Sequence, residues 1–184
     1  MGFEDAVKAI DAELAEKETR QAALLAKTRD AIRDCAKAIK AIHVGEKPSL
    51  DALDAKAAEI RGMDKGFEGI AFSFYQEYAE IKCFLALSGH EELPDYNDLK
   101  IPPLAWLSGL CDFVGELRRA MQIALMAGDR KQAEHCFKEM EHIYDNVMTL
   151  NYTGSIVGGL KSKQDAARGQ VERARSELLG AARG

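Results

Sequence analysis

The stretch Tyr75-Gln76-Glu77-Tyr78-Ala79-Glu80-Ile81-Lys82 carries two glutamates inside an otherwise apolar pattern. Apolar residues recur around it at steps of three and four, which predicts a helix over about 67–88 with one face toward a core. That face consists of Phe67, Ile70, Phe74, Ile81 and Phe84. Glu77 falls between Phe74 and Ile81, and Glu80 lies one turn further on the same side. A carboxylate there is costly unless it is paired, protonated or bound to a cation.

A second pair of acids, Asp112 and Glu116, lies four residues apart in the segment 103–127. This segment is apolar over most of its helical circumference, so we expect it to be a central helix. Gly109 and Gly115 interrupt it, although each glycine costs a helix about 1 kcal/mol relative to alanine. Two glycines beside two acids indicate that another backbone or a ligand approaches closely.

The candidate metal ligands and catalytic acids are therefore Glu77, Glu80, Asp112 and Glu116. Carboxylate oxygens suit Mg²⁺ or Mn²⁺, and such ions could activate a water against a phosphorus centre. A satisfied polar cluster in the core and a wrong assignment of helix faces stay open as alternatives. Glu139 and His142 have the spacing of a di-iron ligand pair, but the sequence has only one such pair, so a solvated pair is favoured.

The rest of the chain also predicts helices, and no strand-like alternation is present. The segments expected to be helical are about 3–43, 49–62, 67–88, 103–127, 130–149 and 160–180, with loops at 89–103 and 150–159. We therefore expect one all-α domain over residues 1–184, a bundle of about six to seven helices.

Charge is unevenly distributed along the chain. The net charge is −5, which argues against wholesale nucleic-acid binding but allows a local basic surface. Residues 20–47 hold seven Lys or Arg against three Asp or Glu, and the last helix has a further basic excess. Spacing alone is compatible with a solvated helix face and with a face that contacts phosphates.

Cysteine usage and hydropathy indicate the compartment. Cys35, Cys83, Cys111 and Cys136 stand alone in helical patterns, which predicts reduced core residues. No apolar run reaches the roughly 18 residues of a membrane span, and no signal peptide is visible. We expect a cytoplasmic protein with no membrane partner.

Six groups of residues follow one another along the chain in an order that is more specific than any one of them alone. They are Thr28-Arg29-Asp30 leading to Ile42-His43, Tyr75-Gln76-Glu77-Tyr78-Ala79-Glu80, Asp112-Phe113-Val114-Gly115-Glu116-Leu117-Arg118-Arg119, Ala127-Gly128-Asp129, Leu150-Asn151, and Leu160-Lys161-Ser162-Lys163. Together they resemble the translin superfamily over about residues 24–180. The two acid pairs are similar to those of the translin-associated factor X branch, which supplies the catalytic acids of the RNA-silencing complex it forms with translin. Translin lacks the full acid set, so Asp112 in particular indicates the nuclease branch.

This resemblance implies a translin-like fold that assembles into a hollow octamer and a Mg²⁺-dependent endoribonuclease that acts on single-stranded RNA inside the shell. The four acids would be catalytic, with Glu80 and Glu116 as direct metal ligands. The basic residues that would hold RNA phosphates are Lys27, Arg29, Arg33, Lys37, Arg119, Lys161 and Lys163. The chain lacks the family's long insertion after the acidic helix, so it is expected to assemble with itself.

Two other functions stay open. The first is a non-catalytic, translin-like shell that binds RNA or DNA and uses the acids structurally. The second is an all-α nucleoside triphosphate pyrophosphohydrolase, although its second acid pair is usually Glu-xx-Asp and closer in sequence. The expected nucleic-acid partner is single-stranded RNA, with duplex RNA or single-stranded DNA as alternatives.

The N-terminal half of the first helix carries an apolar stripe, formed by Phe3, Val7, Ile10 and Leu14. Nothing nearby in the sequence covers it. Such a stripe usually marks a partner surface, and closed homo-oligomers are its commonest partners. The alternative is that residues 3–23 fold back onto their own domain.

Overall fold

The computed structural model of the protein describes residues 2–181, and this range holds eight helices and no strand. The helices are α1 (Phe3–His43), α2 (Asp51–Met63), α3 (Glu68–Ser88), α4 (Tyr96–Leu99), α5 (Pro103–Met126), α6 (Arg130–Met148), α7 (Gly154–Val157) and α8 (Leu160–Ala181). The prediction of an all-α protein is confirmed, and the six long helices match the expected segments. The expected number of about six to seven helices is wrong.

The difference comes from two single-turn helices, α4 and α7, inside segments predicted to be loops. In α4, the Asp95 carboxylate accepts hydrogen bonds from the backbone N–H groups of Asn97 and Asp98, at 2.7 and 2.9 Å. The Asp98 carboxylate accepts in return from the Asp95 N–H group. This reciprocal capping starts one helical turn despite the prolines on either side.

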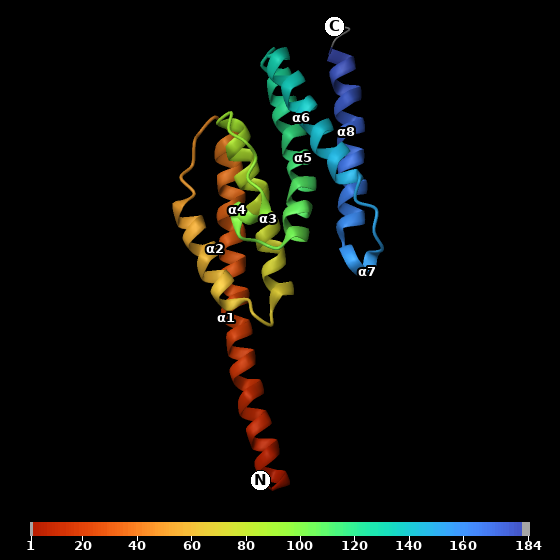
Figure 1. Ribbon diagram of the computed structural model, residues 1–184. Coiled ribbons are helices and arrows are strands. Elements are labelled where there is room, and N and C mark those ends of the chain that lie inside the picture. Colours follow the sequence, from red (N-terminus) through yellow and green to blue (C-terminus); the bar gives the residue numbers. More distant parts are fainter. Residues whose placement is uncertain (1, 182–184) are drawn as a thin grey trace.

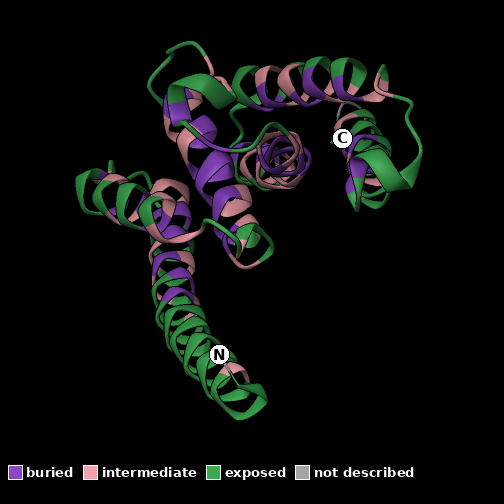
Figure 2. Ribbon diagram, turned by 60° about the horizontal axis from the view of Figure 1, so that its bottom comes forward, coloured by how far each residue is buried: buried purple, intermediate pink, exposed green. Residues whose placement is uncertain are grey.

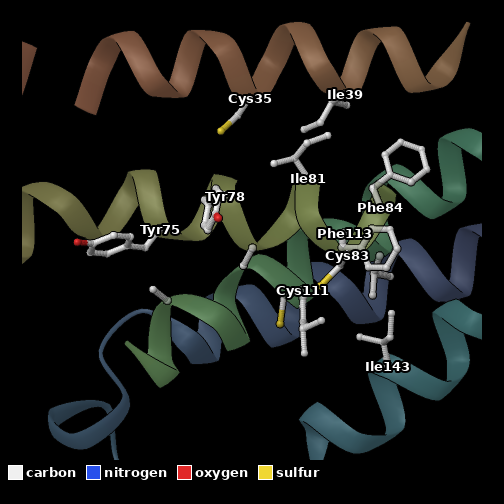
Figure 3. Packing of buried hydrophobic residues seen from close by; sticks show 14 of the residues in the cluster. Cys35, Ile39, Tyr75, Tyr78, Ile81, Cys83, Phe84, Cys111, Phe113 and Ile143 are labelled. Atoms are coloured by element: carbon white, nitrogen blue, oxygen red, sulfur yellow. The ribbon is translucent and has the colours of Figure 1, made fainter. Parts of the chain in front are cut away.

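The bundle is built around α3 and α5, which pack against each other (Figure 1). Helix α1 covers one side of α3, while α6 and α8 cover α5. The buried side chains of Cys35 and Ile39 on α1 face Ile81 on α3 (Figure 3). Phe84 on α3 meets Phe113 on α5 with their ring centroids 5.8 Å apart. The core therefore runs as one cluster from α1 through α3 to α5.

All four cysteines lie within the described residues, where each is buried and none forms a disulfide. The prediction that they lie in the core is confirmed, and their reduced state stays a prediction. Within residues 2–181, no helix is both long and apolar enough to cross a membrane.

The N-terminal half of α1 extends away from the bundle (Figures 1 and 2). Leu24 is the first buried residue of α1. The four large apolar residues before it are at least half exposed: Phe3 85%, Val7 50%, Ile10 56% and Leu14 58%. The alternative that residues 3–23 fold back onto their own domain is therefore wrong.

Gly109 allows α5 to lie against the backbone of α3. A Cβ atom at this position would stand 2.5 Å from the Gln76 carbonyl oxygen and 2.7 Å from the Ala79 Cβ. The predicted close approach of another backbone is thus confirmed here. Gly115, one and a half turns further along α5, is different, because the nearest atom to a Cβ there is Gln170 Nε2 at 3.8 Å.

The two glycines give a matched pair of substitutions. We expect Gly109→Ala to lower the free energy of unfolding by about 1–3 kcal/mol, because the new methyl group forces the two helices apart. Gly115→Ala should be neutral or stabilising by up to about 1 kcal/mol, since alanine favours the helix. Urea unfolding followed by circular dichroism measures both. Equal stability of Gly109→Ala and the wild-type protein would contradict the close contact.

Candidate active site

A cavity of about 440 Å³ lies between α1, α3, α5 and α8, and acids dominate its polar lining. All four predicted acids line it: Glu77 and Glu80 from α3, and Asp112 and Glu116 from α5. The i,i+3 spacing on α3 and the i,i+4 spacing on α5 place each pair on one side of its helix. Because the contact at Gly109 brings the helices together, the two pairs face the same space.

The two α3 acids are buried in the opposite order from the sequence prediction. The helical pattern placed Glu77 on the apolar face, but Glu80 is the buried one, at 6% exposed, and Glu77 is half-buried. The reason is that α3 is covered on both sides. Tyr75, Tyr78 and Ala79 are buried along with the predicted face, so α3 has no single apolar seam.

The α3 carboxylates lack partners in the part of the chain that the structure describes. Burial, and after it the carboxylates of Glu77, Asp112 and Glu116, together raise the pKa of Glu80 to about 9. Burial and then the Asp112 charge also raise the pKa of Glu77. No hydrogen bond contributes to either pKa. Each of these two carboxyl groups therefore faces the cavity either as a carboxylate or in its protonated form, and neither has a counterion of its own among the described residues.

The two α5 acids are partnered, by contrast. The Nζ of Lys163 on α8 lies 2.8 and 2.7 Å from the two carboxylate oxygens of Asp112. Gln76 Nε2 donates a further hydrogen bond to Asp112 at 2.5 Å. Glu116 is hydrogen-bonded to His43 Nε2, and Arg119 Nη1 stands 3.8 Å from it at the rim of the cavity.

His43 is a site residue that no pattern in the sequence indicated as a partner of the acids. Its side chain is 3% exposed, and its ring packs on Phe84 with the centroids 4.9 Å apart. It belongs to the last turn of α1, and its partner Glu116 is 73 residues away in the sequence. No local pattern could have indicated this contact, which fixes the Glu116 carboxylate at one end of the cavity.

The residues fit a hard divalent cation in chemistry but are not pre-arranged around one. Within residues 2–181, no group of three or more His, Cys, Asp or Glu side chains is already placed to hold a metal ion. Both α5 acids already have partners, because Lys163 forms an ion pair with Asp112 and His43 is hydrogen-bonded to Glu116. The donor set itself consists of carboxylate oxygens, which Mg²⁺ and Mn²⁺ prefer, and two of these groups have no partner. A cation would need Asp112 or Glu116 to share or leave its partner.

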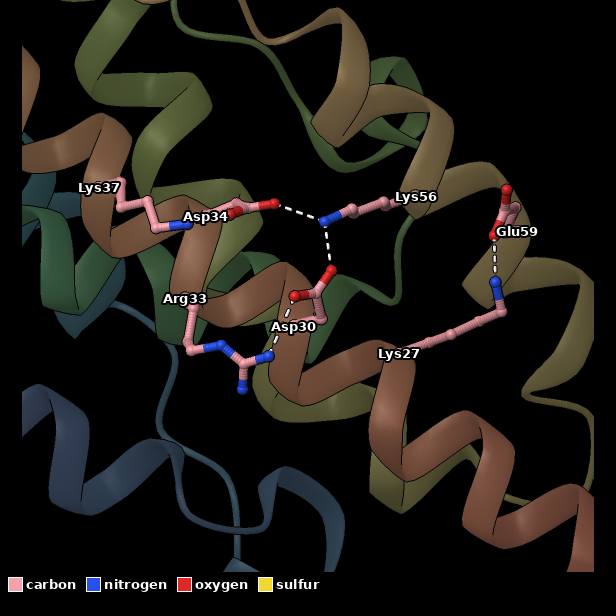
Figure 4. Close-up of polar contacts among 7 residues, drawn as sticks. All are labelled: Lys27, Asp30, Arg33, Asp34, Lys37, Lys56 and Glu59. Atoms are coloured by element: carbon pink, nitrogen blue, oxygen red, sulfur yellow. Dashed lines mark hydrogen bonds and ion pairs between the residues drawn. The ribbon is translucent and has the colours of Figure 1, made fainter.

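The basic residues predicted to bind phosphates are mostly paired with acids. Lys27 pairs with Glu59, while Arg33 and Lys37 lie 3.0 and 2.9 Å from Asp30 and Asp34 (Figure 4). Arg29 and Lys161 are exposed, and neither has a carboxylate partner within residues 2–181. Exposed ion pairs are worth only about 0–1 kcal/mol, so the paired residues can exchange an acid for a phosphate. Phosphate contact stays a prediction for the whole set.

Comparisons with known proteins agree with this architecture. No family model matches the chain. An uncharacterized protein of Methanocaldococcus jannaschii is 28% identical over 174 residues, which cover 90% of this chain and 78% of that protein. The archaeal AfC3PO, solved in complex with duplex RNA, is 30% identical with a TM-score of 0.81 and 96% coverage of both chains.

The chain belongs to the translin superfamily. A second structure of AfC3PO gives a TM-score of 0.78 at 29% identity, again over 96% of each chain. The Neurospora protein NeC3PO, solved in its apo form, has a TM-score of 0.77 at 15% identity, over 95% of this chain and 96% of that one. At this lower identity the similarity to NeC3PO shows the fold alone. The family resemblance predicted from the ordered segments is confirmed.

The pKa of Glu80 predicts how stability depends on pH in the metal-free protein. A carboxyl group whose pKa rises from 4.5 to about 9 on folding binds its proton more tightly in the folded state. Its contribution to stability is full below the unfolded pKa and is lost as the pH rises through the folded pKa. With a chelator present, we expect wild-type stability to fall relative to Glu80→Gln between about pH 5 and pH 9. Urea unfolding at several pH values measures this difference.

Glu13→Gln is the control, because it removes a carboxylate from the exposed half of α1. Its stability should follow that of the wild-type protein at every pH. If the curves of Glu80→Gln and wild type also ran parallel, the carboxyl group of Glu80 would not be held protonated by the cavity.

Proposed function

We propose that the protein is a metal-dependent endoribonuclease that works inside a homo-oligomeric shell. One observation carries the proposal: four carboxylates from two helices line one cavity, and the buried Glu80 and its neighbour Glu77 have no hydrogen-bonding partner there. Uncompensated carboxylates in an interior are costly. A cavity that keeps them is best explained by a cation that binds to them during function.

The residues proposed to hold Mg²⁺ or Mn²⁺ are Glu77, Glu80, Asp112 and Glu116. A divalent ion at this place would supply Lewis acidity toward a phosphodiester and lower the pKa of a water. Arg119, with a side chain 55% exposed at the rim, is suited to hold a phosphate of the backbone at the cavity entrance.

RNA as the substrate is supported by the family and by the charge distribution. AfC3PO, of which this chain covers 96%, forms a complex with duplex RNA. This chain is acidic overall, but Arg29 on α1 and Lys161 on α8 are exposed and have no carboxylate partner within residues 2–181. We therefore propose that duplex RNA as well as single-stranded RNA binds along α1 and α8, and that the cavity cleaves single-stranded RNA.

A non-catalytic shell is the second candidate, and one observation favours it. Asp112 and Glu116 already have partners, so the acids within residues 2–181 form no ready metal site. In that case the same basic residues would bind RNA while the acid cluster served only the fold. Membership of the translin superfamily gives no support to a nucleoside triphosphate pyrophosphohydrolase.

A cleavage assay separates the two candidates. We expect the wild-type protein to cut labelled single-stranded RNA in Mg²⁺ or Mn²⁺ and to do nothing in a chelator. Glu80→Gln and Asp112→Asn should each reduce the cleavage rate by at least about 100-fold, since several kcal/mol of metal-derived stabilisation are lost. RNA binding by Glu80→Gln, measured by fluorescence anisotropy in a chelator, should equal that of the wild-type protein.

Glu134→Gln is the matched control, because this acid lies exposed on α6, outside the cavity. It should cleave like the wild-type protein. Equal cleavage by Glu80→Gln, Asp112→Asn and wild type would remove the proposed site. Tight, salt-sensitive RNA binding with no cleavage in any divalent metal would establish the non-catalytic shell instead.

The exposed stripe on α1 predicts assembly. Its apolar side chains extend beyond the bundle, where nothing in the same chain covers them within residues 2–181. We propose that copies of the chain bury this stripe against one another, in an octamer by resemblance to the family. Light scattering at physiological salt should give a mass far above the 20.2 kDa of one chain.

The double variant Val7→Glu with Ile10→Glu should reduce that mass, because each change places a charge in the proposed contact. Lys8→Gln, on the same exposed segment, is the control and should assemble normally. A wild-type monomer that still cleaves RNA would rule out the shell and leave the acid site standing.

A further inference from the structure

Lys163 is the cation that lies closest to the acids in the described structure. It belongs to the first turn of α8, and its Nζ contacts both carboxylate oxygens of Asp112, at 2.8 and 2.7 Å. Its positive charge also acts to lower the pKa values of Glu77 and Glu80, against the larger effect of burial. In the absence of metal, one lysine therefore balances part of the charge of the whole cluster.

This position conflicts with the binding of a divalent ion. Two cations close to the same carboxylate repel each other, and the repulsion is stronger in a cavity than in bulk water. In the described structure Lys163 occupies both carboxylate oxygens of Asp112, which a metal ion would need. A metal that binds Asp112 must displace the ammonium, at least in part.

Once displaced, the Lys163 ammonium could move from the cavity toward solvent. Its side chain is 34% exposed, so the ammonium lies at the boundary between the cavity and solvent. A lysine has a flexible four-carbon stem with three donors and readily binds phosphate as a point charge. Lys161, exposed two residues earlier, adds positive charge beside it.

We propose that Lys163 is an exchangeable counterion, which holds Asp112 until a divalent cation takes this carboxylate and which then binds a phosphate of the RNA. The inference rests on the proposed function, because it requires the acid cavity to bind Mg²⁺ or Mn²⁺. RNA that captures the lysine favours the metal-accepting arrangement, and metal that displaces the lysine favours RNA. The two ligands must therefore bind cooperatively and reciprocally.

Calorimetric titration of Mn²⁺ into the metal-stripped full chain tests this exchange. Without RNA, Lys163→Met should bind Mn²⁺ at least about fivefold more tightly than wild type, which is the lower end of ordinary coupling between two sites. A 2′-O-methyl oligonucleotide, checked on a gel for integrity afterwards, should tighten Mn²⁺ binding by wild type by a similar factor. It should have no such effect on Lys163→Met.

Lys56→Met is the control, because Lys56 also pairs with two aspartates, Asp30 and Asp34 (Figure 4), and none of these three residues lines the cavity. Its Mn²⁺ affinity should equal that of wild type. The wild-type titrations with and without oligonucleotide need no variant, so they decide the question even if Lys163→Met folds poorly.

The possible failures can be told apart. If Glu80→Gln and Asp112→Asn bind Mn²⁺ as tightly as wild type, the acid cavity is not the metal site and the proposed function fails. If these two variants bind Mn²⁺ weakly but Lys163→Met binds it no more tightly than wild type, the counterion role alone fails. An oligonucleotide that leaves Mn²⁺ binding by wild type unchanged also overturns the counterion role.

Discussion

A carboxylate can lie inside a helical bundle only if something compensates its charge, and Glu80 brings this constraint to the centre of the protein. The residue is 6% exposed, and the other acids of α3 and α5 surround it. The contact at Gly109 brings the acid-bearing faces of α3 and α5 together, so the carboxylates of both helices lie close to one another. Lys163 and His43 contact only the two acids of α5. Within residues 2–181, the two acids of α3 are left without a partner of their own.

Such an arrangement is poorly suited to stability alone. Well-packed apolar residues often replace buried ion pairs without loss of stability, and an unpartnered carboxyl group is more costly still. Natural proteins keep strained or charged clusters mainly where function needs them. The acid cavity is therefore the part of this bundle that most needs a functional explanation, and membership of the translin superfamily supplies a consistent one.

The sequence predicted the helices well because their signals are local. Apolar steps of three and four predicted the long helices, and Gly109 correctly indicated a close backbone contact. The short helix α4 was missed because its capping aspartates stand among prolines, which indicated a loop.

The site was predicted only in part, for reasons that lie in tertiary structure. The four acids were found, yet periodicity could not show whether Glu77 or Glu80 is the more buried, because α3 is buried on both sides. The partners His43 and Lys163 lie 73 and 51 residues from their acids in the sequence. Lys163 was expected to face only phosphates, and nothing in its local pattern indicated that it would bind Asp112.

The most direct test of the account is an anomalous difference map from crystals of the full chain grown with Mn²⁺. The account predicts a peak in the cavity between α3 and α5, within roughly 2.0–2.6 Å of carboxylate oxygens from both helices. In the refined structure of the same crystals, the ammonium of Lys163 should have moved away from Asp112. A fully occupied Mn²⁺ peak elsewhere, with the cavity empty and the Lys163–Asp112 pair intact, would contradict it.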